Sequence, residues 1–566
     1  MLAALVLMGN ASAAAGAASD TTEAGSSDHV AWWREARFGL FIHWGLYAIP
    51  AGMWNGKPTP GMGEHIMQRA KIPVGEYEKL AAQFNPTAFD ADAWISLARQ
   101  AGMKYVVLTA KHHDGFAMFD SAASRWDIVD ATPFGRDVVK ELAEACARHG
   151  LKFGVYYSHA RDWYHPGGAD FRGHWDPARQ DGDMMEYIKN VAAVQVRELL
   201  TNYGPISILW WDTPDLMTPA HAAVLEPLVK LQPGVIMNNR LGGGVDGDFY
   251  TPENVVPASG LPGNWETCMT MNRTWGYRVD DNDWKDTTTL IRHLIDTASK
   301  GGNLLLNIGP MANGEIPVPS VERLREIGEW MGKNSVSIYG TSGVPFRRLS
   351  WGRATRKEDR IYLHVFDWPT DGILRVPARG EVGGAHLLVQ PDRALKIEGA
   401  EDGLRVKLPA QAPDRIASVV VLTGVREFDV LPPPPIRQSD DGTLMLACDT
   451  ADLHGPHLRL AGNTWLNLIG WDTLDSRVEW DVEIERPGDY RVMLHYIAHA
   501  EQAGSDFVFQ VGDAELRGKV AASRNQTVEL GKITLKRSGP QKVVLKPETI
   551  AAKEFLRLRT ITLQPL

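Results

Sequence analysis

Residues 89–109 read FDADAWISLARQAGMKYVVLT, and this stretch indicates the fold. An amphipathic helical pattern ends at Gly102, and a lysine then leads into the apolar run 105–109, which is typical of a strand buried on both faces. A glycine suits the end of a helix because the residue there often takes a positive φ. The stretch therefore predicts one helix–strand unit of an α/β protein.

The same order of helix, glycine and strand recurs along the chain. It is found in residues 137–157 (DVVKELAEACARHGLKFGVYY), again over 185–211, and again over 221–239. Repeated units of this kind fit either an open doubly wound sheet or a closed (β/α)₈ barrel. Both folds place their sites at the carboxyl ends of the strands, so the residues after each strand decide between them.

Polar or aromatic side chains end or follow five successive predicted strands. They are His43 and Trp44, residues 112–114 (HHD), Tyr156, Tyr157 and His159, residues 210–212 (WWD), and Arg240. An open sheet gathers its site at one switch point, whereas a barrel brings every strand end to one mouth, so five contributing strands favour the barrel. No G-x-G-x-x-G motif follows the first strand, which argues against nucleotide binding.

The pattern changes past residue 340, where short alternating segments replace the helices. We predict a (β/α)₈-like barrel over 26–340, a β-sandwich over 341–427, a proline-rich linker over 428–442 and a second sandwich over 443–566. The predicted fold class is thus α/β: a (β/α)₈-type barrel followed by two β-sandwich domains.

Charge and targeting signals bound the possible partners. The formal net charge is −10 and no dense run of lysine or arginine occurs, so we expect no nucleic-acid partner. Residues 1–18 resemble a secretory signal without its basic start, which predicts a periplasmic or secreted protein. The mature chain contains no stretch of eighteen apolar residues, so we expect no membrane span.

Three kinds of site are compatible with these strand ends: a metal hydrolase, an acid/base glycosidase and a binding protein without catalysis. The metal site would use 112–114 with His43 and Asp212, but neither H-x-H nor H-E-x-x-H spacing is present. Adjacent residues of a strand also face opposite ways, so His112 and His113 can both reach the centre only if the strand has already ended. We therefore expect no metal.

Glycosidic cleavage requires two carboxyl groups that flank the bond. Asp212 follows an apolar strand and is the candidate nucleophile, although the same residues, Asp-Thr-Pro, also suit a helix N-cap. The candidates for the acid are Glu253, Glu266 and Glu64, each of which could equally be an ordinary surface glutamate. Spacing alone does not rank them.

Six motifs in order resemble the α-L-fucosidases, family 29 of the glycoside hydrolases. They are 37–45 (RFGLFIHWG), 109–116 (TAKHHDGF), 154–158 (GVYYS), 210–212 (WWD), 265–272 (WETCMTMN) with 275–277 (WGY), and 299–310 (SKGGNLLLNIGP). The resemblance covers a little over half of the chain. It implies a barrel that carries out a retaining double displacement without a metal or organic cofactor.

The resemblance also implies roles for individual residues. Asp212 matches the family nucleophile, and Arg240 with Glu253 matches the arginine and acid/base pair, with Glu266 as the alternative acid. Residues that match sugar-binding positions are His43, Glu64, His112, His113, Tyr157 and Trp210. This chain has His65 where many relatives have tryptophan, which puts one stacking contact in doubt.

The sequence therefore predicts an exo-acting retaining α-L-fucosidase whose partner is a fucosylated glycan. Two alternatives remain: a catalytically silent glycan-binding protein, and an exo-glycosidase that acts on α-L-galactosides. The second sandwich resembles carbohydrate-binding modules, but it could also be a structural appendage or mediate dimerisation, so the oligomeric state stays open.

Overall fold

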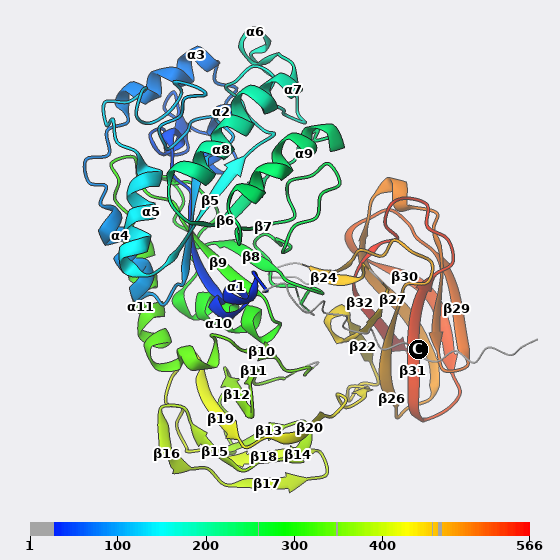
Figure 1. Ribbon diagram of the computed structural model, residues 1–566. Helices are drawn as coiled ribbons and strands as arrows, with labels where there is room; N and C mark the ends of the chain where they lie inside the picture. Colours follow the sequence, from blue (N-terminus) through cyan, green and yellow to red (C-terminus); the bar gives the residue numbers. More distant parts are fainter. Residues whose placement is uncertain (1–27, 258–259, 347–348, 456, 462–466) are drawn as a thin grey trace, which may run out of the picture.

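The structure is a computed structural model, and it describes residues 28–566 except 258–259, 347–348, 456 and 462–466. The predicted signal peptide, 1–18, lies outside the described residues. Figure 1 shows an α/β body at the N-terminal end of the chain, followed by two all-β bodies.

The α/β body is built on one parallel sheet of seven strands in the order β7-β6-β5-β4-β1-β9-β8. The strands are β1 Phe38–Ile42, β4 Tyr105–Lys111, β5 Lys152–Ser158, β6 Ile206–Asp212, β7 Ile236–Met237, β8 Glu266–Thr270 and β9 Asn303–Ile308. A short hairpin, β2 Met53–Trp54 and β3 Lys57–Pro58, lies in the connection after β1.

The segment 249–253 occupies the eighth position and closes the sheet into a barrel. Phe249 forms a parallel bridge with Asn238 just after β7, while Tyr250 and Glu253 form parallel bridges with Trp265 and with Cys268 of β8. The segment therefore pairs with both edges of the seven-stranded sheet, which leaves no open edge. The predicted fold class is confirmed for the barrel.

Six larger helices cover the outside of the barrel (Figure 1). They are α4 Ala91–Gln100, α5 Val138–His149, α8 Ala193–Asn202, α9 Pro219–Leu225, α10 Thr287–Ser299 and α11 Val318–Asn334. The shorter helices are α1 Ala31–Ala36, α2 Ile66–Arg69, α3 Val74–Tyr77, α6 Pro177–Gln180 and α7 Met184–Tyr187. Among the described residues, no helix lies between β7 and β8, so the barrel departs there from regular β/α alternation.

The helix–glycine–strand unit of residues 89–109 forms α4 and β4 as predicted. Asp90 caps α4 by accepting a hydrogen bond from the Ala93 amide at 2.9 Å, and Gly102 has φ of +87°. Asp137 and Gly150 take the same positions around α5, where Gly150 has φ of +71°. Local capping chemistry thus sets where each strand begins.

Two antiparallel β bodies follow. The first contains β10 Ser342–Gly343, β11 Gly352–Lys357, β12 Arg360–Val365, β13 Ile373–Val376, β14 Ala378–Glu381, β15 Gly384–Leu387, β16 Gln390–Ala394, β17 Ile397–Ala400, β18 Gly403–Lys407, β19 Ser418–Thr423 and β20 Arg426–Val430. Its six-stranded sheet packs on a three-stranded one, with Leu363 and Val420 against Leu374 and Val406. This packing makes it a β-sandwich.

The second β body is a sandwich of two six-stranded sheets with its own core. Its strands are β21 Ile436–Arg437, β22 Leu444–Ala447, β23 Asp452–His454, β24 Arg459–Ala461, β25 Asn467–Ile469, β26 Arg477–Ile484, β27 Gly488–Ala498, β28 Asp506–Val511, β29 Ala514–Lys519, β30 Ser523–Leu535, β31 Gly539–Pro547 and β32 Arg557–Pro565. The predicted linker 428–442 includes the end of β20 and all of β21, so 431–435 is its part between strands.

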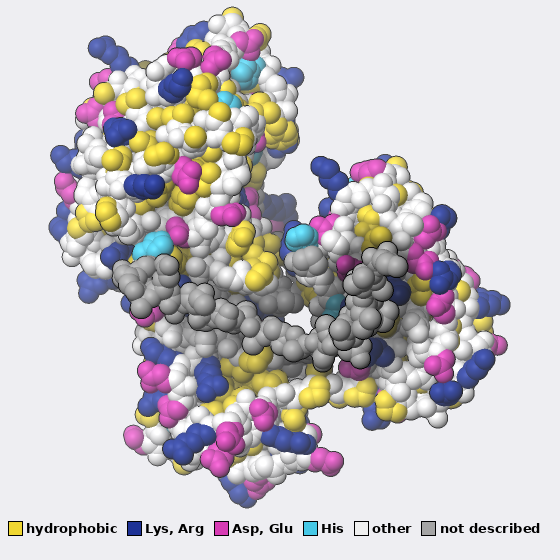
Figure 2. Space-filling view, turned by 45° about the vertical axis from the view of Figure 1, so that its right-hand side comes forward, with side chains coloured by type: hydrophobic (Ala, Val, Ile, Leu, Met, Phe, Trp, Pro, Cys, Tyr) yellow, Lys and Arg dark blue, Asp and Glu magenta, His cyan; other side chains and the backbone are white. Residues whose placement is uncertain are grey.

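The surface carries both signs of charge. Figure 2 shows acidic and basic side chains interspersed over the barrel and the sandwiches on the face that it draws. None of the helices among the described residues is both long enough and apolar enough to cross a membrane.

Candidate active site

A small cavity opens at the carboxyl ends of the barrel strands. Its volume is about 170 Å³, which corresponds to about six water molecules at ~30 Å³ each and so suits a single small ring. The lining residues are Phe41, His43, Met62, Glu64, His65, His112, His113, Tyr156, Arg161, Trp210, Asp212, Thr213, Arg240, Glu253, Cys268 and Trp275. Eight of the ten residues that the sequence singled out as site residues are therefore brought together here.

Asp212 is the last residue of β6 and faces this cavity. Its Oδ1 accepts a hydrogen bond from Arg240 Nη1 at 2.8 Å, and its Oδ2 accepts one from the Tyr156 hydroxyl at 2.7 Å. Burial alone would raise the pKa of Asp212, but the Arg240 charge and the two hydrogen bonds outweigh it and hold the pKa below its ordinary value. Asp212 is therefore ionised at neutral pH, and it caps no helix, because α9 begins later with Thr218 as its N-cap.

Arg240 connects the two candidate catalytic carboxylates. Its Nη1 lies 2.8 Å from Asp212 Oδ1 and 3.4 Å from Glu253 Oε2, and its guanidinium lies 4.8 Å above the ring of Trp210. Thr251 fixes the other side of the guanidinium through its hydroxyl and its carbonyl. Glu253 ends the eighth barrel segment and its side chain is 42% exposed, so it lies between the cavity and solvent.

Three histidines form one wall, and burial keeps them neutral. The pKa of His43 falls to about 4, and the pKa values of His112 and His113 fall well below the ordinary value, mainly because of burial. Strand β4 ends at Lys111, so both His112 and His113 lie past the strand and both line the cavity. The strand thus ends before both histidines, which is the condition under which both can face the centre of the barrel.

Hydrogen-bond partners assign the protons of two of these rings. Asn307 donates its Nδ2–H to the Trp275 carbonyl, so its Oδ1 accepts from His43 Nδ1 at 2.7 Å. Ser158 likewise donates to the Arg161 carbonyl and accepts from His113 Nδ1 at 2.7 Å. In both rings Nε2 is therefore the unprotonated nitrogen, a hydrogen-bond acceptor.

Glu64 and His65 form the side of the cavity between the histidines and the loop after β8. Glu64 Oε2 accepts from the Gly276 amide at 2.8 Å, whereas its Oε1 is buried without a partner. Burial raises the pKa of Glu64 to about 7. The His65 ring lies 5.4 Å from that of His113 and 5.7 Å from that of Trp163, and burial lowers its pKa to about 3.

Tyr157 does not line the cavity, and Tyr156 does. The hydroxyl of Tyr157 donates to Gln195 of α8 at 2.7 Å, on the outer side of the sheet. Neighbouring residues of a strand alternate between faces, and β5 pairs Tyr156 with Trp210 and Tyr157 with Trp211. The position of Tyr157 therefore does not support the sugar contact that the resemblance implied for it, and Tyr156 lines the cavity on the same face as Trp210 and Asp212.

Glu266 also lies away from the cavity. It is the first residue of β8, at the amino end of the strand, and it is 0% exposed. Tyr105, Trp33 and Trp210 all donate hydrogen bonds to its carboxyl group. With its oxygens held inside the barrel below Trp210, Glu266 does not reach the cavity, so the alternative acid assignment is not supported by its position.

The sequence placed Tyr156 at a strand end without assigning it a role, and it did not single out the lining residues Arg161 and Thr213. Arg161 is the clearest case because it comes from the loop three residues after β5 ends, where no periodic pattern marks it. The available signal was its place after a strand whose end already carried Tyr156 and His159.

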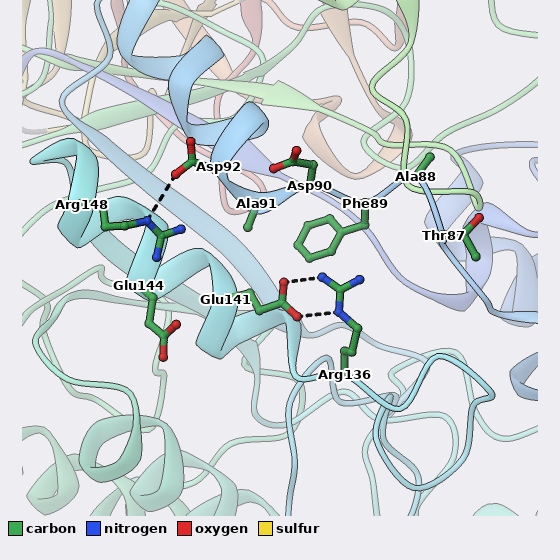
Figure 3. Close-up of a pocket in the computed structure, with 10 residues that line it drawn as sticks. All are labelled: Thr87, Ala88, Phe89, Asp90, Ala91, Asp92, Arg136, Glu141, Glu144 and Arg148. Atoms are coloured by element: carbon green, nitrogen blue, oxygen red, sulfur yellow. Dashed lines mark hydrogen bonds and ion pairs between the residues drawn. The ribbon is translucent and has the colours of Figure 1, made fainter.

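A larger hollow of about 710 Å³ lies elsewhere, on the outside of the barrel between α4 and α5 (Figure 3). Four of its charged side chains form two ion pairs: Arg136 with Glu141 at 2.6 Å and Arg148 with Asp92 at 3.3 Å. Because these charges are paired and no strand end reaches it, the smaller cavity is the candidate active site.

Comparisons with known proteins agree with this geometry. Residues 5–336 match the family model described as alpha-L-fucosidase. Human plasma alpha-L-fucosidase is 32% identical over 431 residues, which cover 70% of this chain and 90% of that protein. An alpha-L-fucosidase structure from Vibrio sp. strain EJY3 superposes with a TM-score of 0.74 at 29% identity, covering 95% of this chain and 98% of that one.

A third relative is a family 29 alpha-L-fucosidase from Bacteroides thetaiotaomicron, with a TM-score of 0.65 at 31% identity, covering 72% of this chain and 98% of that one. The family model spans more than half of the sequence, and the similarity to the Vibrio structure extends through both sandwiches. The chain therefore belongs to the α-L-fucosidases of glycoside hydrolase family 29.

Proposed function

We propose that this α-L-fucosidase removes terminal α-L-fucose from glycans by a retaining double displacement, with Asp212 as nucleophile and Glu253 as acid/base. The observation that carries the proposal is the pair of carboxylates that meet at Arg240 in the small cavity. Asp212 is ionised and accepts hydrogen bonds from Arg240 and Tyr156. Glu253 is exposed to solvent, where a leaving group or water can reach it.

The separation of the two carboxylates supports retention. Asp212 Oδ1 and Glu253 Oε2 lie 2.8 Å and 3.4 Å from the same nitrogen, Arg240 Nη1. The distance between the two carboxylate oxygens cannot exceed the sum of these two distances. That sum is smaller than about 6.5 Å, the shortest separation between the carboxyl groups of inverting glycosidases. A separation below that range favours direct attack by Asp212 over attack by a water held beside it.

In the first step an Asp212 oxygen attacks the anomeric carbon. The bond from that carbon to the glycosidic oxygen breaks, and Glu253 gives its proton to the departing oxygen. In the second step Glu253 takes a proton from water, whose oxygen attacks the same carbon and frees Asp212 and fucose. The Bacteroides thetaiotaomicron relative was solved as a trapped covalent intermediate with 2-fluoro-fucosyl fluoride, which supports the same course here.

The remaining wall suits a neutral sugar whose transition state is positive. Neutral histidines accept hydrogen bonds from hydroxyl groups without adding a charge that would oppose an oxocarbenium ion. Trp275 and Phe41 supply apolar surface for a methyl group. A cavity for one ring also favours exo action, because a chain of sugars can enter only by its end.

The test uses an activated aryl α-L-fucoside with Asp212→Ala, Glu253→Ala and Glu266→Ala. We expect Asp212→Ala to lose at least about 10³-fold in kcat, and azide to restore Glu253→Ala with α-fucosyl azide as product. Glu266→Ala is the matched control, and azide should not change its rate. Azide rescue confined to Glu266→Ala would refute the acid assignment, and no hydrolysis by correctly folded wild-type protein would leave the silent glycan-binding alternative.

A further inference from the structure

The cavity accommodates one sugar, so whatever is attached to that sugar must cross the rim. The rim beside β5 and β6 carries two exposed apolar side chains, Phe171 at 60% exposure and Leu216 at 66%. The Phe171 amide lies 3.4 Å from Asp215 Oδ2, so the loops after β5 and β6 contact each other there. An exposed aromatic face next to a sugar cavity is a suitable platform for the next unit.

Two guanidinium groups flank Phe171. Those of Arg161 and Arg172 each lie 5.1 Å from the centre of the Phe171 ring. Arg161 is 6% exposed and also lines the cavity, so one side chain joins the proposed fucose position to the rim. Only Arg161 therefore separates Phe171 from the cavity.

The charges at this rim are unevenly paired. Asp215 forms an ion pair with Arg161, with 2.7 Å between Oδ2 and Nη2. Asp170 accepts hydrogen bonds from the Gln68 side chain and from the Arg172 backbone amide. Within the described residues, neither Arg172 nor Arg69 forms an ion pair, and Arg69 Nε is buried without a partner. The rim thus has two guanidinium groups available for an anion.

His65 provides a second, independent indication. It lines the cavity, and its Nδ1 is buried without a hydrogen-bond partner among the described residues. The charges of Arg161, Arg69 and Arg172 all act on its ring. A polar group is thus left unpartnered where the cavity meets the three arginines, which is costly unless a ligand satisfies it.

We propose that the rim formed by Arg69, Arg161, Phe171 and Arg172 is an aglycone subsite for a sugar unit that carries a carboxylate or a sulfate group. This inference rests on the proposed fucosidase activity and names its substrate class. Phe171 stacks on the ring of that unit, and the free guanidinium groups bind its anion.

The experiment compares pairs of aryl α-L-fucosides that differ only in charge. One pair is 4-carboxyphenyl against 4-carbamoylphenyl fucoside, and the other is 4-sulfophenyl against 4-sulfamoylphenyl fucoside. For each pair, the charged-to-neutral ratio of kcat/KM is measured in the wild type and in Arg172→Gln, so that differences in leaving-group reactivity cancel. The two pairs separate a carboxylate partner from a sulfated one.

We expect the ratio to fall by about three- to five-fold in Arg172→Gln, the range of an exposed ion pair, and to fall in the wild type as salt is raised. Arg148→Gln, on the outer hollow of Figure 3, is the matched control and should keep the wild-type ratio. Equal ratios in wild type and Arg172→Gln for both pairs would overturn the inference. Hydrolysis of none of the four substrates would instead overturn the proposed function.

Discussion

At the scale of single residues, the site depends on how Asp212 keeps its charge while buried. Its side chain is only 14% exposed, and burial of an unpaired carboxylate would push its pKa upward. Arg240 and the Tyr156 hydroxyl reverse that effect. Tyr156 therefore lines the cavity and also helps to keep Asp212, the proposed nucleophile, ionised.

Replacing Tyr156 by phenylalanine should therefore move the pH profile. The variant loses a hydrogen bond to the ionised form, so the pKa of Asp212 rises and the acidic limb of kcat/KM moves to higher pH. We expect the acidic limb to move by about one pH unit, because a hydrogen bond to a charged group contributes about 1.5 kcal/mol. Tyr157→Phe, which loses only the bond to Gln195, is the control, and an equal shift in both variants would contradict this role.

At the scale of elements, much of the barrel could be predicted because its signals are local. Helix periodicity, Asp caps and glycines with positive φ marked α4, β4, α5 and β5. The eighth segment, 249–253, carried no such signal, because it is short, contains Pro252 and forms only isolated bridges to its neighbours. Glu253 could be ranked above Glu266 and Glu64 only through the family resemblance, since nothing local placed it at a strand end.

For a related reason, the sequence did not show which of Tyr156 and Tyr157 faces the barrel interior. Strand β5 is buried on both faces, so burial does not tell which tyrosine faces the barrel interior. The register against β6 decides it, and register is a property of two strands that a single stretch of sequence does not show. Glu266 stayed an alternative acid for a similar reason, because its motif does not show that β8 begins at this residue rather than ending there.

A glycine in β1 shows how closely these elements pack inside the barrel. A Cβ on Gly39 would lie 2.3 Å from the ring of Tyr105, which is fully buried and holds Glu266. Gly39→Ala should therefore destabilise the protein by about 1–3 kcal/mol through overpacking. Gly332→Ala in α11, where a Cβ meets nothing, should be neutral or stabilising. Denaturant unfolding measures both, and equal stability of the two variants would contradict the packing argument.

At the scale of the whole molecule, the barrel and the first sandwich share buried surface. Tyr362, Val419 and Val421 of the sandwich belong to the same hydrophobic cluster as the barrel helices. Arg292 of α10 donates to the carbonyls of Phe366 and Ile416. The second sandwich has a separate core, so the chain consists of a joined barrel and sandwich followed by a more independent unit.

A buried histidine at this junction should make stability depend on pH. Burial lowers the pKa of His364 on β12 to about 3, so between about pH 6.5 and pH 3 the unfolded chain binds a proton that the folded chain does not. The His364 contribution to stability is therefore lost as pH falls. Between pH 7 and pH 5 the loss in unfolding free energy should be about 2 kcal/mol smaller in His364→Gln than in the wild type. Urea unfolding at the two pH values measures it, and equal losses would rule out His364 as the cause.

Two shortened chains test how the three bodies depend on one another. A chain that ends after Leu431 keeps every residue of the cavity and all of the shared cluster, so its kcat/KM on a small aryl fucoside should stay within about two-fold of the full chain. A chain that ends after Gly340 leaves Trp330 without the Ala417 carbonyl to which it donates, and it exposes the face that packed on Val419 and Val421. Since unsatisfied donors and exposed apolar surface both cost stability, it should be insoluble or poorly folded.

If the longer chain instead loses its activity on the small substrate, the second sandwich supports the barrel directly. If it loses activity only on a polymeric glycan, the second sandwich acts by binding that glycan and raising its local concentration.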